Sequence, residues 1–313
     1  MHRKLPVFLV GSERSGTTLL RLMLDHHPEI AFNLESDFLT TRISDDGVFP
    51  EVGDYIEFLR NDRVFLHSRF EIRDGLDFVG LAHDFLEQKR MRDRKAIAGA
   101  TVHYQFSKLG RIWPRAKYIH LFRDGRDVAH SVVQMGWAGN AYVGADWWLK
   151  AETEWENYRA TLGEGSWIEV RYEELIANPV EQLTRICHFI GVDYSSRMFD
   201  YVKHTSYRMP DLALTYQWKH KLCREEIQKL EARIGDRLLS KGYGLSGYPR
   251  IELSRVEKRY LRMHSKVGAL GYRLRKYGAM LLIQYNMARR LGRKEWSSRI
   301  GYMLNAIDDA YIK

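Results

Sequence analysis

A short apolar run, a glycine-bounded loop and a helix-forming stretch follow one another at the start of the chain. Residues 5–10 (LPVFLV) have the length and composition of a buried parallel strand. After the loop at residues 11–16 comes TTLLRLMLDHH, which is rich in helix formers and ends before Pro28. Because N–H groups at a helix N-terminus attract anions, this order predicts an α/β fold with an anion-binding loop after its first strand.

The loop has the glycine spacing of the phosphate-binding pattern G-x-x-x-x-G-K-[ST] but lacks its lysine. Gly11, Gly16 and Thr18 match the pattern, whereas Thr17 replaces the lysine and the cation moves back to Arg14. In that pattern the lysine reaches the outer phosphates and the hydroxyl holds magnesium. The loop therefore suits an anion better than a magnesium-bound triphosphate. A tight turn with hydroxyls capping the helix is the alternative, but five suitable residues in one turn favour the anion site: Arg14, Ser15, Gly16, Thr17 and Thr18.

A second candidate anion site lies about a hundred residues later. Residues 117–122 (KYIHLF) resemble a strand and are followed by residues 123–127 (RDGRD) and a helical stretch. Arg123 is therefore expected at the carboxyl end of a strand, where open α/β sheets bind ligands. Ser131, eight residues on, adds a hydroxyl, and an arginine fork with a hydroxyl suits a phosphate monoester. A salt-bridged turn is the alternative.

With these two segments in this order, the chain resembles the sulfotransferases that use 3′-phosphoadenosine 5′-phosphosulfate (PAPS), in particular bacterial enzymes related to the tyrosylprotein sulfotransferases. The resemblance runs from about residue 5 to about residue 245 and includes residues 14–30 (RSGTTLLRLMLDHHPEI) and 170–175 (VRYEEL). It implies that residues 14–18 hold the 5′-phosphosulfate, that Arg123 and Ser131 hold the 3′-phosphate, and that Tyr172 contacts the adenine. Arg208 and Lys219 lie in segments that loosely resemble a loop closing over the nucleotide.

The resemblance implies transfer of a sulfuryl group from PAPS to an acceptor hydroxyl by in-line displacement without a metal. Such a transfer requires mainly positioning and charge stabilisation from the protein. Arg14 is the candidate for stabilising the charge on the leaving phosphate. PAPS is therefore the expected co-substrate, and no metal is expected.

Two residues are candidates for the base that accepts the proton of the acceptor. Glu35 follows a plausible second strand, and its spacing from Arg14 resembles that of the catalytic glutamate in the tyrosylprotein enzymes. His103 lies in ATVHY, which corresponds to the K-T-H segment of the cytosolic sulfotransferases. Ala100 stands where that pattern has its lysine, so either Arg14 acts alone or another cation such as Lys108 replaces the lysine.

Two other function classes remain. A kinase with a degenerate phosphate loop is disfavoured by the absent lysine and by the arginine–serine pair at positions 123 and 131. A non-catalytic nucleotide-binding protein is favoured only by Ala100, whereas Arg14 and Glu35 indicate retained chemistry. Asp37, Phe38 and residues 48–67 are the expected wall of the acceptor pocket.

Length and charge divide the chain unevenly. Of the 313 residues, those from 5 to 191 alternate between strand-like and helical stretches without a linker or repeat, which predicts a P-loop-type parallel sheet flanked by helices in residues 1–248. From residue 251 onward there are 14 Lys and Arg against 5 Asp and Glu, which is the whole excess of +9. Residues 249–313 are therefore expected to form a basic helical C-terminal extension.

The partners follow from this charge and from the missing motifs. The apolar residues 277–283, flanked by cations, fit either a membrane surface or packing on the domain or on a second subunit as a homodimer, and no nucleic-acid motif accompanies them. The positions after Glu35 lack the arginines of the tyrosine-modifying enzymes, so the expected acceptor is a small molecule, lipid or glycan. Without a signal-peptide or membrane-span pattern, a cytoplasmic enzyme is expected, with the inner face of the membrane as a second location.

Overall fold

The computed structural model describes residues 4–311 and contains two compact units. The first comprises the chain up to residue 128 together with residues 147–217. The second comprises residues 129–146 and the chain from residue 218 onward. The expected boundary between residues 248 and 249 falls inside the second unit and stays a prediction.

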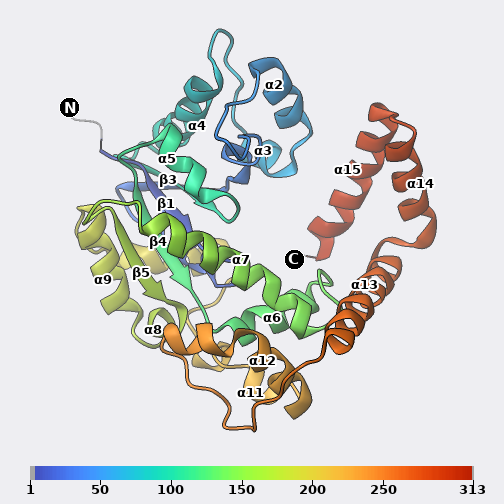
Figure 1. Cartoon of the computed structure of the whole chain (residues 1–313). Coiled ribbons are helices and arrows are strands. Elements are labelled where there is room, and N and C mark those ends of the chain that lie inside the picture. Colours follow the sequence, from blue (N-terminus) through green and yellow to red (C-terminus); the bar gives the residue numbers. More distant parts are fainter. Residues whose placement is uncertain (1–3, 312–313) are drawn as a thin grey trace. The chain divides into compact units, whose positions relative to one another are not determined.

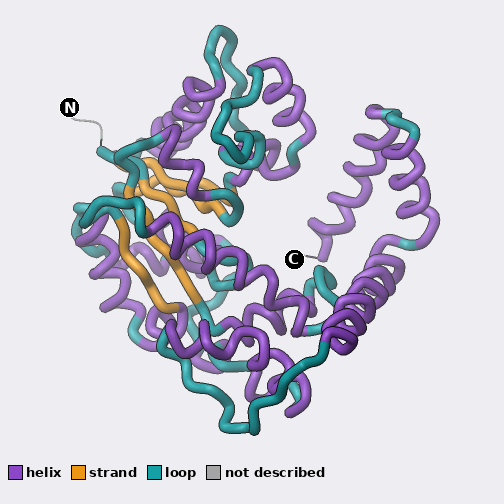
Figure 2. The backbone as a smooth tube through the Cα atoms, viewed as in Figure 1, coloured by secondary structure: helices purple, strands orange, loops and turns teal. Residues whose placement is uncertain are grey.

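A five-stranded parallel sheet forms the centre of the first unit (Figures 1 and 2). Its strands are β1 (Val7–Val10), β2 (Ile30–Glu35), β3 (Ile97–Val102), β4 (Lys117–Phe122) and β5 (Trp167–Arg171), in the spatial order β2-β3-β1-β4-β5. All four neighbouring pairs are parallel, so the carboxyl ends of the strands meet at one edge. The predicted α/β fold with a parallel sheet is confirmed.

Alternating side chains of β1 enter two separate hydrophobic cores, one on each face of the sheet. Phe8 and Val10 belong to the core that also contains side chains of α4, α5 and the end of α7, while Val7 and Leu9 belong to the core with α1, α8 and α9. This alternation is the two-residue period of a strand that is covered on both faces. The central strand is therefore buried on both sides, and the loop that follows it starts from a rigid position.

The helices of the first unit surround this sheet. They are α1 (Thr17–Asp25), α2 (Val52–Asn61), α3 (Arg63–Ser68), α4 (Phe78–Asp93), α5 (Leu109–Ile112), α8 (Tyr172–Ala177), α9 (Pro179–Ile190) and α10 (Tyr201–His204), with 3-10 turns η1 (Asp37–Leu39), η2 (Phe106–Lys108), η3 (Ser196–Phe199) and η4 (Leu212–Leu214). Two longer helices, α6 (Gly125–Gln134) and α7 (Ala141–Arg159), have residues in both units.

The second unit contains the predicted helical C-terminal region. Its further helices are α11 (Trp218–Lys221), α12 (Arg224–Ser240), α13 (Arg255–Tyr277), α14 (Ala279–Arg290) and α15 (Lys294–Tyr311). Within this unit α13 packs on the turn between α6 and α7, where the Gly139 N–H donates to Ser265 Oγ (2.9 Å) and the Asn140 side-chain amide donates to the Leu261 carbonyl (2.8 Å). Among the described residues, no helix has both the length and the apolar composition that crossing a membrane requires.

The aromatic cluster around α4 provides a test of the core on that face of the sheet. Phe85 is fully buried, and its ring centroid lies 5.1 Å from that of Phe65, 5.5 Å from Phe70 and 6.1 Å from Phe38. We expect Phe85→Ala to lower the free energy of unfolding by about 3–5 kcal/mol, because it leaves a cavity among these rings. Urea denaturation measures this loss. The control Met91→Ala, on the exposed side of the same helix, should change the stability by less than about 0.5 kcal/mol; equal losses would contradict the assignment of this core.

Candidate active site

The loop after β1 depends on two glycines that approach neighbouring elements closely. Gly11 has φ +145°, and a Cβ there would lie 2.3 Å from the carbonyl oxygen of Leu121 in β4. Gly16 has φ +91°, and a Cβ there would lie 2.3 Å from the ring of Tyr172 in α8. Any larger residue would push the loop away from both neighbours. The glycine spacing seen in the sequence therefore fixes the position of the loop over the carboxyl edge of the sheet.

The N-terminus of α1 has the features of an anion site. Gly16 is its N-cap residue, no described side chain caps the helix, and its first turn has no acidic residue. Ser15 is fully buried, yet its Oγ has no hydrogen-bond partner among the described residues. Because buried hydroxyls usually have partners, this oxygen is a candidate for a ligand contact. The alternative of a turn capped by hydroxyls is therefore not what the structure shows. Thr17 is buried and Thr18 half-buried in the first turn, and Arg14 before them is exposed.

Arg123, at the end of β4, joins four segments of the first unit. Its guanidinium pairs with Asp127 (3.0 Å) and donates to the carbonyl oxygens of Leu214 (2.6 Å) and Arg14 (3.4 Å). The guanidinium carbon also lies 4.5 Å from the centroid of the Tyr172 ring. The two segments that the sequence analysis singled out thus meet at one place.

The salt-bridged turn that the sequence left open is also present. Arg126 and Asp124 are both buried and paired (2.8 Å), and the Asp124 N–H donates to Glu173 (3.0 Å). Arg123 makes its own pair with Asp127. An anion at Arg123 would therefore share the guanidinium with a carboxylate, while Arg126 serves the turn itself.

Tyr172 lies between the two segments. Its ring packs against Gly16 on the loop and against the Arg123 guanidinium, and the residue is 4% exposed. Burial raises the pKa of Tyr172, so the phenol stays neutral and its ring is an apolar surface beside the loop.

The two candidate bases lie side by side. His103 Nδ1 is 2.9 Å from the carbonyl oxygen of Gly11, which can only accept, so Nδ1 carries a proton. His103 Nε2 then faces Glu35 Oε1 at 3.9 Å. The Glu35 side chain, at the end of β2, is 46% exposed, whereas that of His103 is 2% exposed. The carboxylate is thus the member of the pair that solvent can reach.

Two further carboxyl groups surround His103. Asp37 accepts the N–H groups of His103 (2.7 Å) and Tyr104 (2.9 Å), which fixes the segment after β3. Glu13, in the loop itself, contacts the Tyr104 hydroxyl. Burial raises the pKa of Asp37 to about 6 and that of Glu13 to about 7. No local sequence pattern points to Glu13 or Tyr104, because their contact joins residues that are far apart in the chain.

The remaining residues named from the sequence make other contacts within the first unit or belong to the second unit. Ala100 is fully buried in the middle of β3, opposite Phe8 of β1. Lys108 binds the Ile43 carbonyl (2.6 Å) and Asp45 (3.2 Å). Arg208 is exposed, and its carbonyl accepts from the Tyr201 hydroxyl (2.9 Å). Ser131 in α6 and Lys219 in α11 belong to the second unit. In the described part of the chain, no three His, Cys, Asp or Glu side chains are grouped to hold a metal ion.

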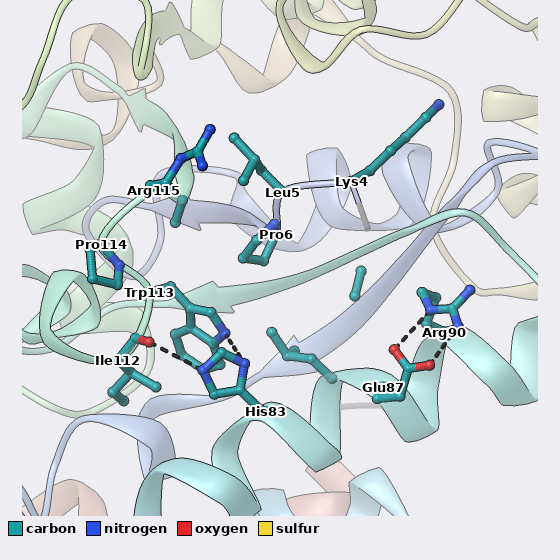
Figure 3. Close-up of a pocket in the computed structure, with 13 residues that line it drawn as sticks. Lys4, Leu5, Pro6, His83, Glu87, Arg90, Ile112, Trp113, Pro114 and Arg115 are labelled. Carbon is teal, nitrogen blue, oxygen red and sulfur yellow. Dashed lines mark hydrogen bonds and ion pairs between the residues drawn. The ribbon is translucent and has the colours of Figure 1, made fainter. Parts of the chain in front are cut away.

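A cavity of about 320 Å³ lies at the opposite edge of the sheet (Figure 3). Leu5 and Pro6, just before β1, and Ala116, just before β4, contribute to its wall. At its side the Trp113 indole N–H donates to Nδ1 of His83 (3.1 Å). Because the amino ends of the strands line this cavity, it is separate from the candidate active site.

Comparisons with known proteins identify the family and the fold. The model of the sulfotransferase family matches residues 6–196. A putative protein-tyrosine sulfotransferase of Caenorhabditis briggsae is 25% identical over 197 residues, which cover 61% of this chain and 67% of that protein. Protein-tyrosine sulfotransferase 2 of Gallus gallus is 26% identical over 208 residues, which cover 60% of this chain and 52% of that protein. The aligned part thus spans about half to two-thirds of the length of these relatives.

Two solved structures share the fold. The sulfotransferase domain of the Synechococcus PCC 7002 olefin synthase superposes with a TM-score of 0.59 at 20% identity and covers 78% of this chain and 98% of that domain. The sulfotransferase domain of the curacin biosynthetic pathway gives 0.54 at 19% identity, with 77% and 99% covered. The sulfotransferase family model matches more than half of the residues of this chain, so the protein belongs to that family.

The half-buried carboxyl group of Glu13 predicts a pH dependence of stability. Its pKa is raised from 4.5 to about 7 in the folded protein, so between these values the folded state keeps a proton that the unfolded state has lost. The free energy of unfolding should therefore fall as the pH rises through this window. Glu13→Gln, which can still bond Tyr104, should reduce that fall when chemical denaturation is compared at about pH 5 and about pH 8. The exposed control Glu164→Gln should behave like the parent protein; an unchanged slope in Glu13→Gln would disprove the assignment.

Proposed function

We propose that this protein transfers a sulfuryl group from PAPS to an acceptor hydroxyl. The observation that carries the proposal is the meeting of the Gly11–Gly16 loop, Arg123 and Tyr172 at one edge of the sheet, beside Glu35 and His103. Membership of the sulfotransferase family supports it. The use of PAPS, the mechanism and the role of each residue are parts of the proposal.

The loop and α1 would hold the 5′-phosphosulfate. The unpartnered Oγ of Ser15, the amides of the first turn and the hydroxyls of Thr17 and Thr18 supply donors, and the helix dipole favours negative charge. Arg14 would stabilise the charge that develops on the bridging oxygen. This arrangement neutralises the leaving phosphate with protein groups alone, so the proposed mechanism uses no metal.

Arg123 would hold the 3′-phosphate, and Tyr172 would contact the adenine. The Nε of Arg123 is buried without a hydrogen-bond partner among the described residues, and its contact with the Leu214 carbonyl can be exchanged for a phosphate oxygen. Arg208, in the exposed segment before η4, would be a further nucleotide contact. The role of Ser131 stays a prediction, since it lies in the second unit.

Glu35 would act as the base. In the reaction the acceptor oxygen forms a bond to sulfur, the bond between sulfur and the 5′-phosphate oxygen breaks, and the acceptor proton moves to the carboxylate. Adenosine 3′,5′-bisphosphate then leaves with the electron pair of the broken bond. His103, held through Nδ1 by the Gly11 carbonyl, faces Glu35 across 3.9 Å and is the second candidate for the base.

The acceptor class and location are further proposals. The carboxyl groups of Glu13, Glu35 and Asp37 lie close enough to influence one another's charge, so this side of the site disfavours an acidic peptide. A small-molecule, lipid or glycan hydroxyl is therefore proposed as acceptor. A cytoplasmic location stays a prediction.

Nucleotide preference tests the donor site. Isothermal titration should show tighter binding of adenosine 3′,5′-bisphosphate than of magnesium–ATP, because the loop lacks the lysine that serves a triphosphate. Arg123→Ala should weaken binding of the bisphosphate by about tenfold to a hundredfold, through loss of charge-assisted hydrogen bonds. Arg115→Ala, an exposed arginine at the opposite edge of the sheet, is the control. A preference for magnesium–ATP would favour a kinase instead.

Removing the proposed base should separate chemistry from binding. Glu35→Gln should lower turnover of labelled PAPS, measured with an acceptor library, by about a hundredfold to ten-thousandfold. Its affinity for adenosine 3′,5′-bisphosphate should stay within about twofold of the parent, because the change leaves the loop intact. His103→Asn serves as the comparison. If Glu35→Gln keeps normal turnover and His103→Asn has none, the base is His103 and not Glu35.

A further inference from the structure

Helix α13 exposes a continuous apolar seam. The seam consists of six large apolar residues whose steps along the chain alternate between four and three positions. All six are 40–77% exposed: Val256, Tyr260, Met263, Val267, Leu270 and Leu274. This spacing averages 3.5 residues, so the side chains form one stripe along the helix. Contiguous exposed apolar side chains mark interaction sites on soluble proteins, so this stripe is a candidate binding surface.

The opposite side of α13 already has its packing partner. Ser265 accepts from the Gly139 N–H, the Leu261 carbonyl accepts from Asn140, and the Cα of Gly268 lies 2.9 Å from the position of a Cβ at Gly139. These three α13 residues lie between seam residues in the sequence and contact the turn between α6 and α7. The helix is thus held in the second unit by one side, and the seam is not part of that contact.

Cations flank the seam along its whole length. Helix α13 has eight Lys and Arg and one Glu, a net charge of +7 (8 − 1) in 23 residues. Arg259, Lys266 and Arg273, spaced by seven, each directly precede a seam residue, and all three are exposed. Long cationic side chains beside an apolar stripe keep their charge at a polar boundary while their stems cover apolar surface.

The charge selects among the partners that an apolar stripe can have. A second copy of α13 would bring another +7 against the first, and in an antiparallel pair the Arg259, Lys266 and Arg273 rows would face each other. In a parallel pair these cations would face His264 and Gly271 rather than carboxylates. Neither arrangement neutralises the flank. A membrane surface with an apolar interior and anionic groups at its boundary would cover the seam and neutralise the flanking cations along the whole helix.

We propose that α13 binds an anionic phospholipid surface, with the seam inserted at the boundary of the acyl chains and its flanking cations on the lipid phosphates. The next helix repeats the pattern. Met280, Ile283 and Met287 of α14 are exposed, and Arg289 and Arg290 follow them. This proposal does not depend on the sulfotransferase activity, and it gives the basic C-terminal region a function of its own.

Vesicle co-sedimentation of the full chain tests the proposal. The protein should sediment with vesicles of phosphatidylcholine and phosphatidylglycerol at low salt, weakly at high salt, and not with phosphatidylcholine alone. The triple variant Met263→Gln, Val267→Gln and Leu270→Gln keeps every charge and should bind at least about tenfold more weakly, because the seam supplies the apolar contact. A matched control, Met91→Gln with Val48→Gln, removes equally exposed apolar side chains of the first unit and should bind like the parent.

Charge reversal tests the flank separately. Arg259→Glu with Lys266→Glu should also weaken binding by at least about tenfold, whereas Arg60→Glu with Arg115→Glu, two exposed cations of the first unit, should have little effect. Circular dichroism checks that every variant keeps its helix content, so that loss of binding is not loss of fold.

Three results would overturn the proposal. Absence of binding to anionic vesicles at low salt removes it directly. If the seam variant binds vesicles as tightly as the parent, the interaction is general electrostatic attraction and the seam does not take part in it. Self-association that the seam variant abolishes in sedimentation velocity, without vesicle binding, would assign the seam to a second copy of the chain.

Discussion

The close approach of the first loop to its neighbours is the constraint on which the site depends. Gly11 and Gly16 let the backbone pass within distances of β4 and α8 that a Cβ would forbid. This contact directs the N-terminus of α1 toward the carboxyl edge and places Tyr172 beside Arg123. This edge of the sheet is therefore organised by close backbone approach, and the candidate site residues are attached to a rigid frame.

The charges at this edge are separated into two regions. Arg14 and Arg123 lie on the side of β1 and β4, where the loop and the α1 N-terminus also favour an anion. Glu35, Asp37 and Glu13 surround His103 on the side of β2 and β3. The proposed reaction needs an environment that favours anions for the phosphates of the donor and a carboxylate for the proton of the acceptor, and this separation of charge is consistent with both requirements.

Local patterns in the chain were sufficient for part of this site. The strand, loop and helix at residues 5–25, the strand before Arg123 and the position of Glu35 at the end of β2 are found where the patterns predicted them. These features depend on neighbours in sequence, such as apolar runs and glycine spacing. Two contacts could not be predicted: that of Glu13 with Tyr104, and the hydrogen bonds that Asp37 accepts from the segment after β3. Each joins residues more than sixty positions apart.

The sequence by itself determined the fold class, the glycine-bounded loop between β1 and α1, the family resemblance and the basic C-terminal helices, since each is encoded in periodicity, composition or a contiguous motif. The tertiary structure decided which of these elements meet. The sheet order places β3 between β1 and β2, and this brings His103 between Gly11 and Glu35. Likewise, the sequence shows the apolar spacing of α13, but only packing shows that its other side is occupied and that the seam faces outward. Burial and exposure arise from contacts distant in the chain, so local sequence does not specify them.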